Sequence, residues 1–436
     1  MKLKKFAIAG AIAAALSASV SVVPASAELV FPSLSYRTGP YAPNGIPFAD
    51  GYSDYFTLIN ERDGGVGGVK ISNPECETGY NTEKGVECYE STKGEGSGAL
   101  IYQPLSTGIT YQLIPKVTAD GIPLHSMAYG RTSAMNGKVF NWVFNYPANY
   151  WDGATIAVQH AKDMSGGDLN GKTIALVYHN SAYGKEPIRT LEEKAKSEGF
   201  KLTLIPVDHP GQEQKSQWLQ IRRERPDFVF MWGWGVMNAV AIQEAANIRY
   251  PMDHFIGIWW SGAEQDVLPA GDGANGYKSL NFTYVGKDKP VFADIQKYVV
   301  DAGKAAGDGS NIGTVQYNRG MYAAMLAVEA ARKAQEMSGT MDINAAQMRD
   351  GMENLNVDAA RLEELGMAGF GPAVSVSCAN HGGSGEALVQ QWDAGAKQWK
   401  AITEFMPADR ELVTRLAMED SEAFAKENNI TPRECK

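Results

Sequence analysis

The chain has 436 residues and a formal net charge of −10, with 44% hydrophobic and 21% charged residues. This acidic balance excludes nucleic acid and anionic membrane as expected partners, because both carry negative charge themselves. The length exceeds the roughly 50–250 residues of a typical domain, so we expect two lobes rather than one core.

The N-terminus has the three parts of a secretory signal. Lysines at positions 2, 4 and 5 precede an apolar run over 6–23, and the small residues Ala25-Ser26-Ala27 follow it. This order predicts a cleaved signal peptide over 1–27. Cleavage removes three lysines and no acid, which changes the net charge from −10 to −13.

The rest of the chain predicts a protein that is free in solution. No later stretch reaches the roughly 20 apolar residues of a membrane helix. A lipid anchor needs a cysteine at the new terminus, but that residue is Glu28 and the first cysteine is Cys76. We therefore expect an exported, soluble protein of the periplasm, without stable membrane insertion.

Four cysteines in an exported chain predict disulfides, with three possible pairings. Cys76 and Cys88 flank a turn-rich segment and form the favoured local bridge. Cys378 and Cys435 then pair by default and hold the tail. Free buried thiols are the alternative.

Short apolar strands alternate with helical patterns from residue 28 onward, which is typical of parallel βαβ units. The first set comprises a strand over 29–35, a helix over 51–61, a strand over 99–105, a helix over 111–119 and a closing segment over 140–145. These elements predict the sheet of the first lobe.

The clearest block of the chain follows and predicts a second sheet. Its strands are 172–179, 201–207, 227–233 and 254–260, and its helices are 186–198, one ending near 225, and 239–246. Each strand is apolar enough to be buried on both faces. The block therefore forms a separate open α/β lobe.

The last third of the chain suggests a return to the first lobe and a second departure. A strand over 276–286 leads to helices over 290–306, 316–337 and 344–355, then to a β-rich run over 374–402 and a helical tail over 408–428. Crossings are expected near Asn149, Tyr277 and Gly366.

The fold class predicted is α/β, with two Rossmann-like lobes, a ligand crevice between them and three interlobe crossovers. The predicted parts are the signal peptide 1–27, an N-terminal lobe of 28–149 plus 277–365, a C-terminal lobe of 150–276 plus 366–407, and a helical tail over 408–436.

Enzyme signatures are absent from the sequence. There is no HExxH, no GxSxG and no phosphate-binding loop, and the histidines at 125, 160, 179, 209, 254 and 381 lack metal-ligand spacing. The one GxGxxG, at Gly271, Gly273 and Gly276, leads into a strand rather than a helix and is interpreted as a turn. No catalytic residue, metal or cofactor is predicted.

Three features resemble one known family. The strand-end loop LSYRTGPYAPNG precedes a helix ending INERDGGVGGVKI, the turn YHNSAYGKE follows an apolar strand, and the elements come in the same order. The chain resembles the periplasmic substrate-binding proteins of branched-chain amino acid type ABC transporters, a type I binding fold with amide-, urea- and aromatic-acid-binding relatives. The resemblance implies a monomer that binds a small molecule and delivers it to permease and ATPase subunits.

Ligand sites of open α/β sheets lie where the carboxyl ends of the strands converge. Hydroxyls and N–H groups at a helix start suit a ligand carboxylate. The resemblance matches 106–108 to the family's carboxylate loop, 126–132 to a second backbone contact and Tyr183 to the tyrosine of an xYG turn. Each is open to a plainer interpretation as a cap or wall. The predicted ligand residues are Tyr36, Thr38, Ser106, Thr107, Gly108, Ala128, Tyr129, Gly130, Tyr183, Trp234 and Trp259.

One departure from the family bears on specificity. Its amino acid binders hold the ligand ammonium with an acid after the last strand of the second lobe, where this chain has Trp259, and the nearest acid is Glu264. Burying an ammonium without such a partner costs several kcal/mol. We therefore expect a carboxylate with an aromatic or apolar body rather than a branched-chain amino acid.

Tryptophan pairs at 232/234 and 259/260 suggest an aromatic wall of the second lobe. Strand neighbours point to opposite faces, so one of each pair should face the core, and Trp234 and Trp259 are favoured for the crevice. A quaternary ammonium held by cation–π attraction, a sensor subunit, and an amino acid, amide or urea binder are the alternatives.

Overall fold

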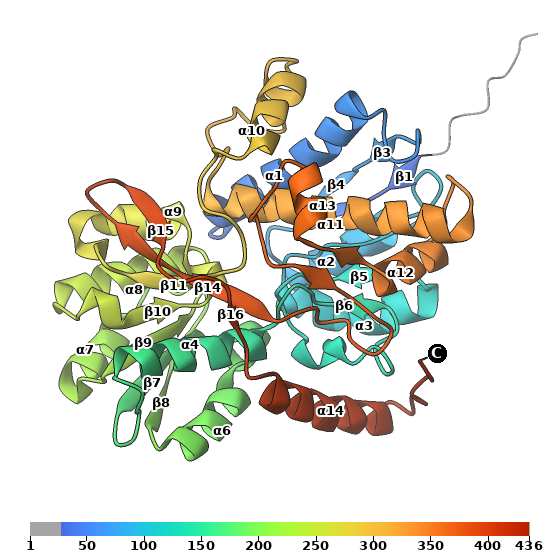
Figure 1. The fold of residues 1–436 in the computed structure, drawn as a ribbon. Coiled ribbons are helices and arrows are strands. Elements are labelled where there is room, and N and C mark those ends of the chain that lie inside the picture. The colour runs from blue at the N-terminus through green and yellow to red at the C-terminus, as the bar shows by residue number, and fades with distance from the viewer. Residues whose placement is uncertain (1–27, 436) are drawn as a thin grey trace, which may run out of the picture.

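The computed structural model describes residues 28–435 and forms two α/β lobes (Figure 1). The predicted signal peptide lies outside the described residues. None of the helices described has the length and hydrophobicity needed to span a bilayer.

The first lobe is built on a parallel sheet of very short strands. Its pairs are β1 (Leu29–Val30) with β3 (Ile71–Ser72), β2 (Ser33–Ser35) with β4 (Glu75–Glu77), and β5 (Leu124–His125) with β6 (Val143–Phe144). The expected strand 99–105 takes part only through isolated bridges, from Ala99 to Val30, Gln103 to Ser33 and Tyr102 to Leu124. These bridges join the pairs into one layer.

Helices from two distant parts of the chain complete this lobe. They are α1 (Ala42–Arg62), α2 (Thr82–Thr92), α3 (Thr107–Asp120), η1 (Thr132–Met135), α10 (Pro290–Ile295), η5 (Gln296–Val300), α11 (Val315–Ser338), α12 (Ala345–Glu353) and α13 (Ala359–Glu364), with the small hairpin of β12 (Asn356–Val357) and β13 (Val374–Ser375). Helices α1 and α11 cross closely, because a Cβ at Gly51 would lie 2.0 Å from the Tyr317 carbonyl oxygen. Glycine is therefore required at that crossing.

Two helices of the first lobe differ from the prediction. Helix α1 begins well before residue 51, because Pro43 in its first turn needs no N–H partner and favours the helix start. Helix α2 was not predicted at all. Asn81, interpreted as a turn residue, is its N-cap and accepts a hydrogen bond from the Lys84 N–H.

The second lobe has one eight-stranded sheet in the order β15-β14-β11-β10-β9-β7-β8, with β16 beside β14. The strands are β7 (Thr173–His179), β8 (Lys201–Val207), β9 (Phe228–Trp232), β10 (Phe255–Gly257), β11 (Lys278–Asn281), β14 (Glu386–Asp393), β15 (Gln398–Ala401) and β16 (Met406–Pro407). Strands β7 to β11 run parallel, and β14 to β16 are added antiparallel.

Two expectations about these strands are wrong. Strand β8 lies at the sheet edge with Leu204 37% exposed, so it is not buried on both faces. Strand β10 ends at Gly257, and Trp259–Ser261 form the short turn η3 instead of continuing it. An apolar run by itself does not distinguish a strand from a buried turn.

The helices of the second lobe flank its sheet. They are α4 (Tyr150–Met164), α5 (Ala182–Lys185), α6 (Ile188–Glu198), α7 (Lys215–Glu224), α8 (Val236–Asn247), η2 (Met252–His254), α9 (Glu264–Val267) and η4 (Leu268–Ala274). Gly271 and Gly273 lie in the short 3-10 helix η4 rather than in a turn, and Gly276 lies in the turn before β11, so the motif leads into a strand as expected.

The strand pairings bear on the expected crossings. Asn149 caps α4, where the chain enters the second lobe. Residues 278–281, expected in the N-terminal lobe, pair with β10 and β14 of the second sheet. The stretch after Gly366, expected in the C-terminal lobe, stays on the first lobe as far as His381, whose N–H donates to the Met135 carbonyl. The expected lobe boundaries remain predictions. Each of these two segments, however, lies in the lobe opposite to the one expected for it.

Both disulfides are confirmed. Cys76 pairs with Cys88 and Cys378 with Cys435, with Cα–Cα distances of 5.7 Å and 5.6 Å. The second bridge holds the end of the tail helix α14 (Arg410–Glu427), which lies along both lobes (Figure 1).

Candidate functional site

Aromatic side chains from both lobes meet between the two sheets. We call Tyr36, Tyr80, Tyr129, Tyr150, Tyr183, Trp234, Trp259 and Trp260 the interlobe aromatic cluster. Tyr129 of the first lobe stacks on Trp260 of the second with ring centroids 4.2 Å apart, and Tyr36 meets Trp234 edge to face at 6.3 Å. All members except Tyr80 are buried. The cluster is the interface of two closed lobes.

The first-lobe wall is formed by loop ends and one helix start. Ser106 caps α3 by accepting a hydrogen bond from the Ile109 N–H at 3.3 Å, and the Thr107 hydroxyl accepts one from the Gly130 N–H at 3.3 Å. Ala128 has a positive φ of 56°, an uncommon conformation for a residue with a side chain. This wall therefore presents hydroxyls and backbone groups, as expected.

The Ala128 carbonyl is occupied by the protein itself. The indole N–H groups of Trp259 and Trp260 both donate to it, each at 3.0 Å. Ala128 thus ties the two lobes together. Both indoles reach the opposite lobe because they lie on the turn η3, where the alternation of a strand does not apply. We expected only one of these two tryptophans to face the interface. Both do, so Trp260 is an interface residue that the sequence did not predict.

The side chains of the second-lobe wall are held by hydrogen bonds to one backbone carbonyl and by a close backbone approach. The Tyr183 hydroxyl donates to the Gly233 carbonyl at 2.9 Å, and the Ser261 hydroxyl donates to the same oxygen at 2.8 Å. A Cβ at Gly184 would lie 1.9 Å from the His179 carbonyl oxygen, so the turn after Tyr183 requires glycine. Trp234 follows the end of β9 and packs on Trp260 with centroids 5.5 Å apart.

Among the described residues, three buried donors of the cluster have no partner at normal hydrogen-bond geometry, although Tyr36 acts weakly on Tyr129 and Thr107 on Tyr150. They are the hydroxyls of Tyr129 and Tyr150 and the indole N–H of Trp234. Burial raises the pKa of both tyrosines well above its ordinary value, so both stay protonated and able to donate. An unpaired buried polar group costs about 1–3 kcal/mol. These donors are suited to a ligand with acceptor atoms.

The two acids near the cluster are already bonded. Asp266 accepts hydrogen bonds from the Ala263 N–H at 2.8 Å, from Asn238 at 3.1 Å and, across the interface, from Asn44 at 3.2 Å. Glu264 begins α9 and accepts a hydrogen bond from the Val315 N–H at 3.1 Å. Burial raises the pKa of Asp266 to about 6 and that of Glu264 to about 7. Neither was assigned a ligand role from sequence.

Two further contacts close the lobes on each other. The Tyr111 hydroxyl donates to the Glu186 carboxylate at 2.5 Å, and the Tyr41 hydroxyl shares hydrogen bonds with His179, at 3.0 Å, and with His209. Gly130 lies close to the same carboxylate, since a Cβ there would be 2.2 Å from a Glu186 oxygen and would push that side chain away.

Two predicted ligand residues lie apart from the cluster. Thr38 is exposed and donates to the Glu77 carboxylate at 3.1 Å. Gly108, in the first turn of α3, faces α2, since a Cβ there would lie 3.1 Å from the Thr82 hydroxyl. The other nine predicted residues lie at the interface.

Sequence reasoning missed Arg319, a fully buried residue of α11 beside the cluster. Its guanidinium donates to the Trp259 carbonyl and, at 3.0 Å, to the Asn281 side-chain oxygen. The residues 320–328 that follow it carry no charge. A single arginine directly before such an uncharged helical run is the sequence pattern that could have identified this residue.

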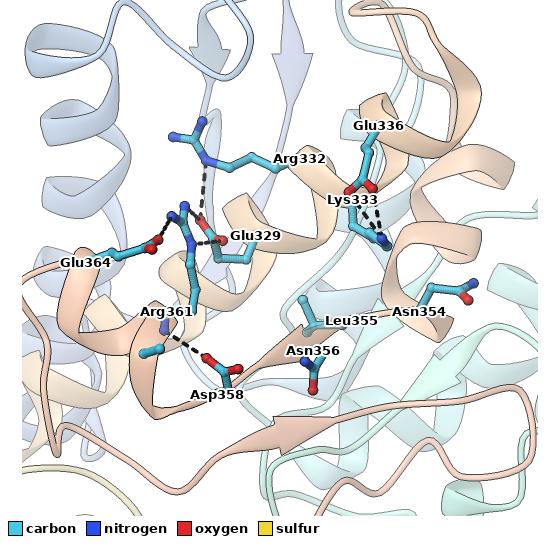
Figure 2. A pocket seen from close by; sticks show the side chains of 11 residues that line it. Glu329, Arg332, Lys333, Glu336, Asn354, Leu355, Asn356, Asp358, Arg361 and Glu364 are labelled. Atoms are coloured by element: carbon cyan, nitrogen blue, oxygen red, sulfur yellow. Dashed lines mark hydrogen bonds and ion pairs between the residues drawn. The ribbon is translucent and has the colours of Figure 1, made fainter.

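A pocket of 530 Å³ on the outside of the first lobe is a weaker candidate (Figure 2). It is lined by charged side chains from α11 and α13 that bind one another. Arg361 pairs with Glu329 at 2.8 Å and with Glu364 at 2.7 Å, and Lys333 pairs with Glu336 at 3.1 Å. Because these charges are already paired, the pocket is better explained as a solvated ion-pair network.

Comparisons with known proteins agree with this geometry. Residues 29–397 match the model of a family described as periplasmic binding protein. The chain is 41% identical to a solved protein from the Pseudomonas fluorescens group described as an ABC transporter permease; the match covers 94% of this chain and 100% of that one, with a TM-score of 0.88. No curated protein sequence matches the chain.

Two more distant structures share the fold alone. A branched-chain amino acid ABC transporter protein from Thermus thermophilus with bound valine is 19% identical over 89% of this chain and 98% of that one, with a TM-score of 0.74. A solute-binding protein from R. palustris in complex with benzoate is 17% identical over 87% and 97%, with a TM-score of 0.67. The predicted type I fold of two α/β lobes is confirmed.

Proposed function

Because this chain belongs to the periplasmic binding protein family, we propose that it is the substrate-binding component of an ABC importer and captures a small carboxylate with an aromatic or apolar body. The ligand is held between the lobes and is not chemically changed. The family consists of solute-binding proteins, which supports binding without catalysis.

The unpaired donors of the cluster are the observation that carries this proposal. Tyr129, Tyr150 and Trp234 are buried without partners, so a bound acceptor lowers the cost of closing the lobes. A carboxylate supplies two acceptor oxygens, and the surrounding rings suit an apolar body.

The acids at the interface argue against an ammonium ligand. Asp266 is the carboxylate best placed to meet one, but three N–H donors already bind it. A ligand ammonium would have to displace one of them. An amino acid ligand is therefore the second candidate, and it depends on Asp266 exchanging a partner.

The proposed ligand residues are those of the predicted set that lie at the interface. Ser106, Thr107 and Gly130 form the carboxylate end. Tyr36, Tyr129, Tyr183, Trp234 and Trp259 form the body of the site, and Ala128 holds the indoles of the second lobe.

The remaining steps follow from the family and the predicted signal peptide. The protein acts in the periplasm as a monomer and delivers its ligand to permease and ATPase subunits. It uses no cofactor and contacts no nucleic acid.

A thermal-shift screen of purified protein tests the proposal. It compares aromatic acids, aliphatic acids, amino acids, amides, urea and betaines. A ligand at 100 times its Kd stabilises the fold by about 2.7 kcal/mol, which such a screen resolves. We expect the largest shifts from acids without an amino group. Tight leucine or valine binding with no response to other acids would contradict the proposed ligand class.

A further inference from the structure

Arg319 is a charged residue in a buried, largely apolar part of the fold. It is in the first third of α11, fully buried, and the nine residues after it are uncharged. Arginine is rarely buried completely unless it is paired. The contacts of its guanidinium show how many of its N–H donors have a partner.

The guanidinium is only partly satisfied. It has five N–H donors, of which one binds the Trp259 carbonyl and one the Asn281 side chain, while its Nε has no partner. Both acceptors are neutral. Among residues 28–435, no carboxylate forms an ion pair with Arg319 within 4.0 Å.

Aromatic faces supply part of the missing compensation. The guanidinium carbon lies 5.2 Å from the centre of the Trp260 ring and 5.3 Å from that of Phe282. Cation–π contacts of this kind are weaker than an ion pair with a carboxylate. A positive charge therefore remains without an anionic partner.

The same charge lies next to the proposed ligand groups. Arg319 contacts Trp259 and Trp260 directly, and Trp260 stacks on Tyr129. Burial holds the pKa of Tyr129 well above its ordinary value, so this side chain is neutral and does not offset the guanidinium charge. The guanidinium thus lies directly behind the second-lobe wall of the site.

The two neighbouring acids act on this charge but do not form an ion pair with it. Asp266 and Glu264 influence Arg319 from beyond ion-pair distance, and N–H donors already bind both. Burial raises the pKa of each toward neutrality, which reduces their mean negative charge near pH 7. Arg319 itself stays charged, because burial lowers its pKa only to about 9.

We infer that Arg319 is a specificity-determining residue: its buried, incompletely paired guanidinium makes the interlobe site prefer an anionic ligand over a neutral ligand of the same shape. This inference rests on the proposed function. It adds the group that selects for charge, which lies on a helix of the first lobe behind the aromatic wall.

Matched pairs of acid and amide test the inference in the full mature protein. Benzoate against benzamide and butyrate against butyramide differ in charge but hardly in shape, and calorimetry gives both Kd values. The wild type should bind the better acid at least about tenfold more tightly than its amide. A tenfold change in Kd corresponds to about 1.4 kcal/mol, and the interaction of a ligand carboxylate with a buried charge exceeds this value. Arg319→Gln should remove most of this preference and leave amide affinity within about threefold.

Two variants serve as controls. Arg319→Lys retains the charge and should keep most of the acid preference. Arg332→Gln removes an arginine of the same helix that is partly exposed and should change neither Kd. Equal loss of acid and amide affinity in Arg319→Gln would show that Arg319 only holds the tryptophans in place, and it would overturn the inference.

A measurement on the wild type covers the case in which Arg319→Gln does not fold. Salt screens a buried charge far less than an exposed one. The ratio of amide to acid Kd should therefore change less than about threefold between 0.02 and 0.5 M NaCl. A ratio that collapses in salt overturns the inference. A wild type that binds none of the acids overturns the proposed function as well, whereas acid preference that survives Arg319→Gln overturns the inference alone.

Discussion

The first-lobe wall of the interface presents hydroxyls and backbone groups at a helix start and in loops after very short strands or isolated bridges, whereas the second-lobe wall presents rings beyond the ends of a continuous sheet. Ser106 and Thr107 represent the first wall, and Trp234, Trp259 and Trp260 the second. The difference suggests a division of work. Under the proposed function, the first wall would orient a polar end of the ligand and the second would enclose its body.

The two walls also depend on each other. The indoles of the second wall donate to the Ala128 carbonyl of the first, and Asn44 of the first binds Asp266 of the second. Closure therefore builds the site from both lobes at once. Substitutions that remove one wall at a time separate orientation, enclosure and closure.

The largest effect is expected from Trp259→Ala, which removes a fully buried ring and one bond to Ala128. It should lower the free energy of unfolding by about 3–5 kcal/mol and weaken the best ligand by at least about 1 kcal/mol. Denaturant unfolding and calorimetry measure the two effects. Trp218→Ala, a buried tryptophan of α7 in a separate core, is the matched control. It should destabilise similarly and leave ligand affinity unchanged; equal affinity losses would place Trp259 in the core only.

Tyr111→Phe tests closure without touching either wall. It removes the interlobe hydrogen bond to Glu186, whose pKa is raised by burial. Loss of this bond should weaken ligand binding by about 1–2 kcal/mol, because closure becomes less favourable. Tyr89→Phe removes a bond of the same type to Asp120 within the first lobe and is the control. If both variants bind ligand equally well, the Tyr111 bond does not contribute to closure.

Acid should weaken ligand binding through His179. Burial, and secondarily His209, lowers its pKa to about 4 in the closed protein, while Asp208 acts in the opposite direction. Its ring also meets Tyr41 and the Ser181 hydroxyl. Because protonated imidazole is disfavoured when closed, stability of the closed state is present above the ordinary pKa near 6.5 and is lost as pH falls toward 4.

Through His179 alone the Kd should therefore rise by up to about tenfold between pH 7.5 and 5.5, while protonation of the buried Asp266 and Glu264, whose pKa values are raised, acts in the opposite direction. Titration calorimetry at several pH values measures this change. In His179→Gln the dependence should become flatter. A pH profile identical to that of the wild type in this variant would show that another group titrates.

Ser106→Ala should have the smallest effect and concerns the first wall alone. Loss of the α3 cap should cost about 1 kcal/mol of stability and lower the affinity for acids more than for amides. Asn344→Ala removes the equivalent N-cap of α12, which belongs to neither wall, and is the control. We expect equal stability losses from both variants by thermal unfolding. Unchanged acid affinity in Ser106→Ala would remove Ser106 from the ligand site.

Much of the fold could be predicted because it depends on local patterns. The apolar strand β7, the tail helix α14 and the pairing of Cys76 with Cys88 follow from short stretches of sequence. The α2 helix was missed because its glycine and asparagine favour turns as well as caps. Local propensity does not decide between these two uses of the same residues.

By itself the sequence predicted two lobes, the order of most elements and the favoured pairing of both disulfides, because periodicity and composition record which residues are buried; the wall residues came largely from the family resemblance. Only the tertiary structure decided that β11 joins the second sheet, that Trp259 and Trp260 both reach Ala128, and that Arg319 lies behind them. These features depend on contacts between segments far apart in the chain, and no local pattern encodes which distant partner a buried side chain meets.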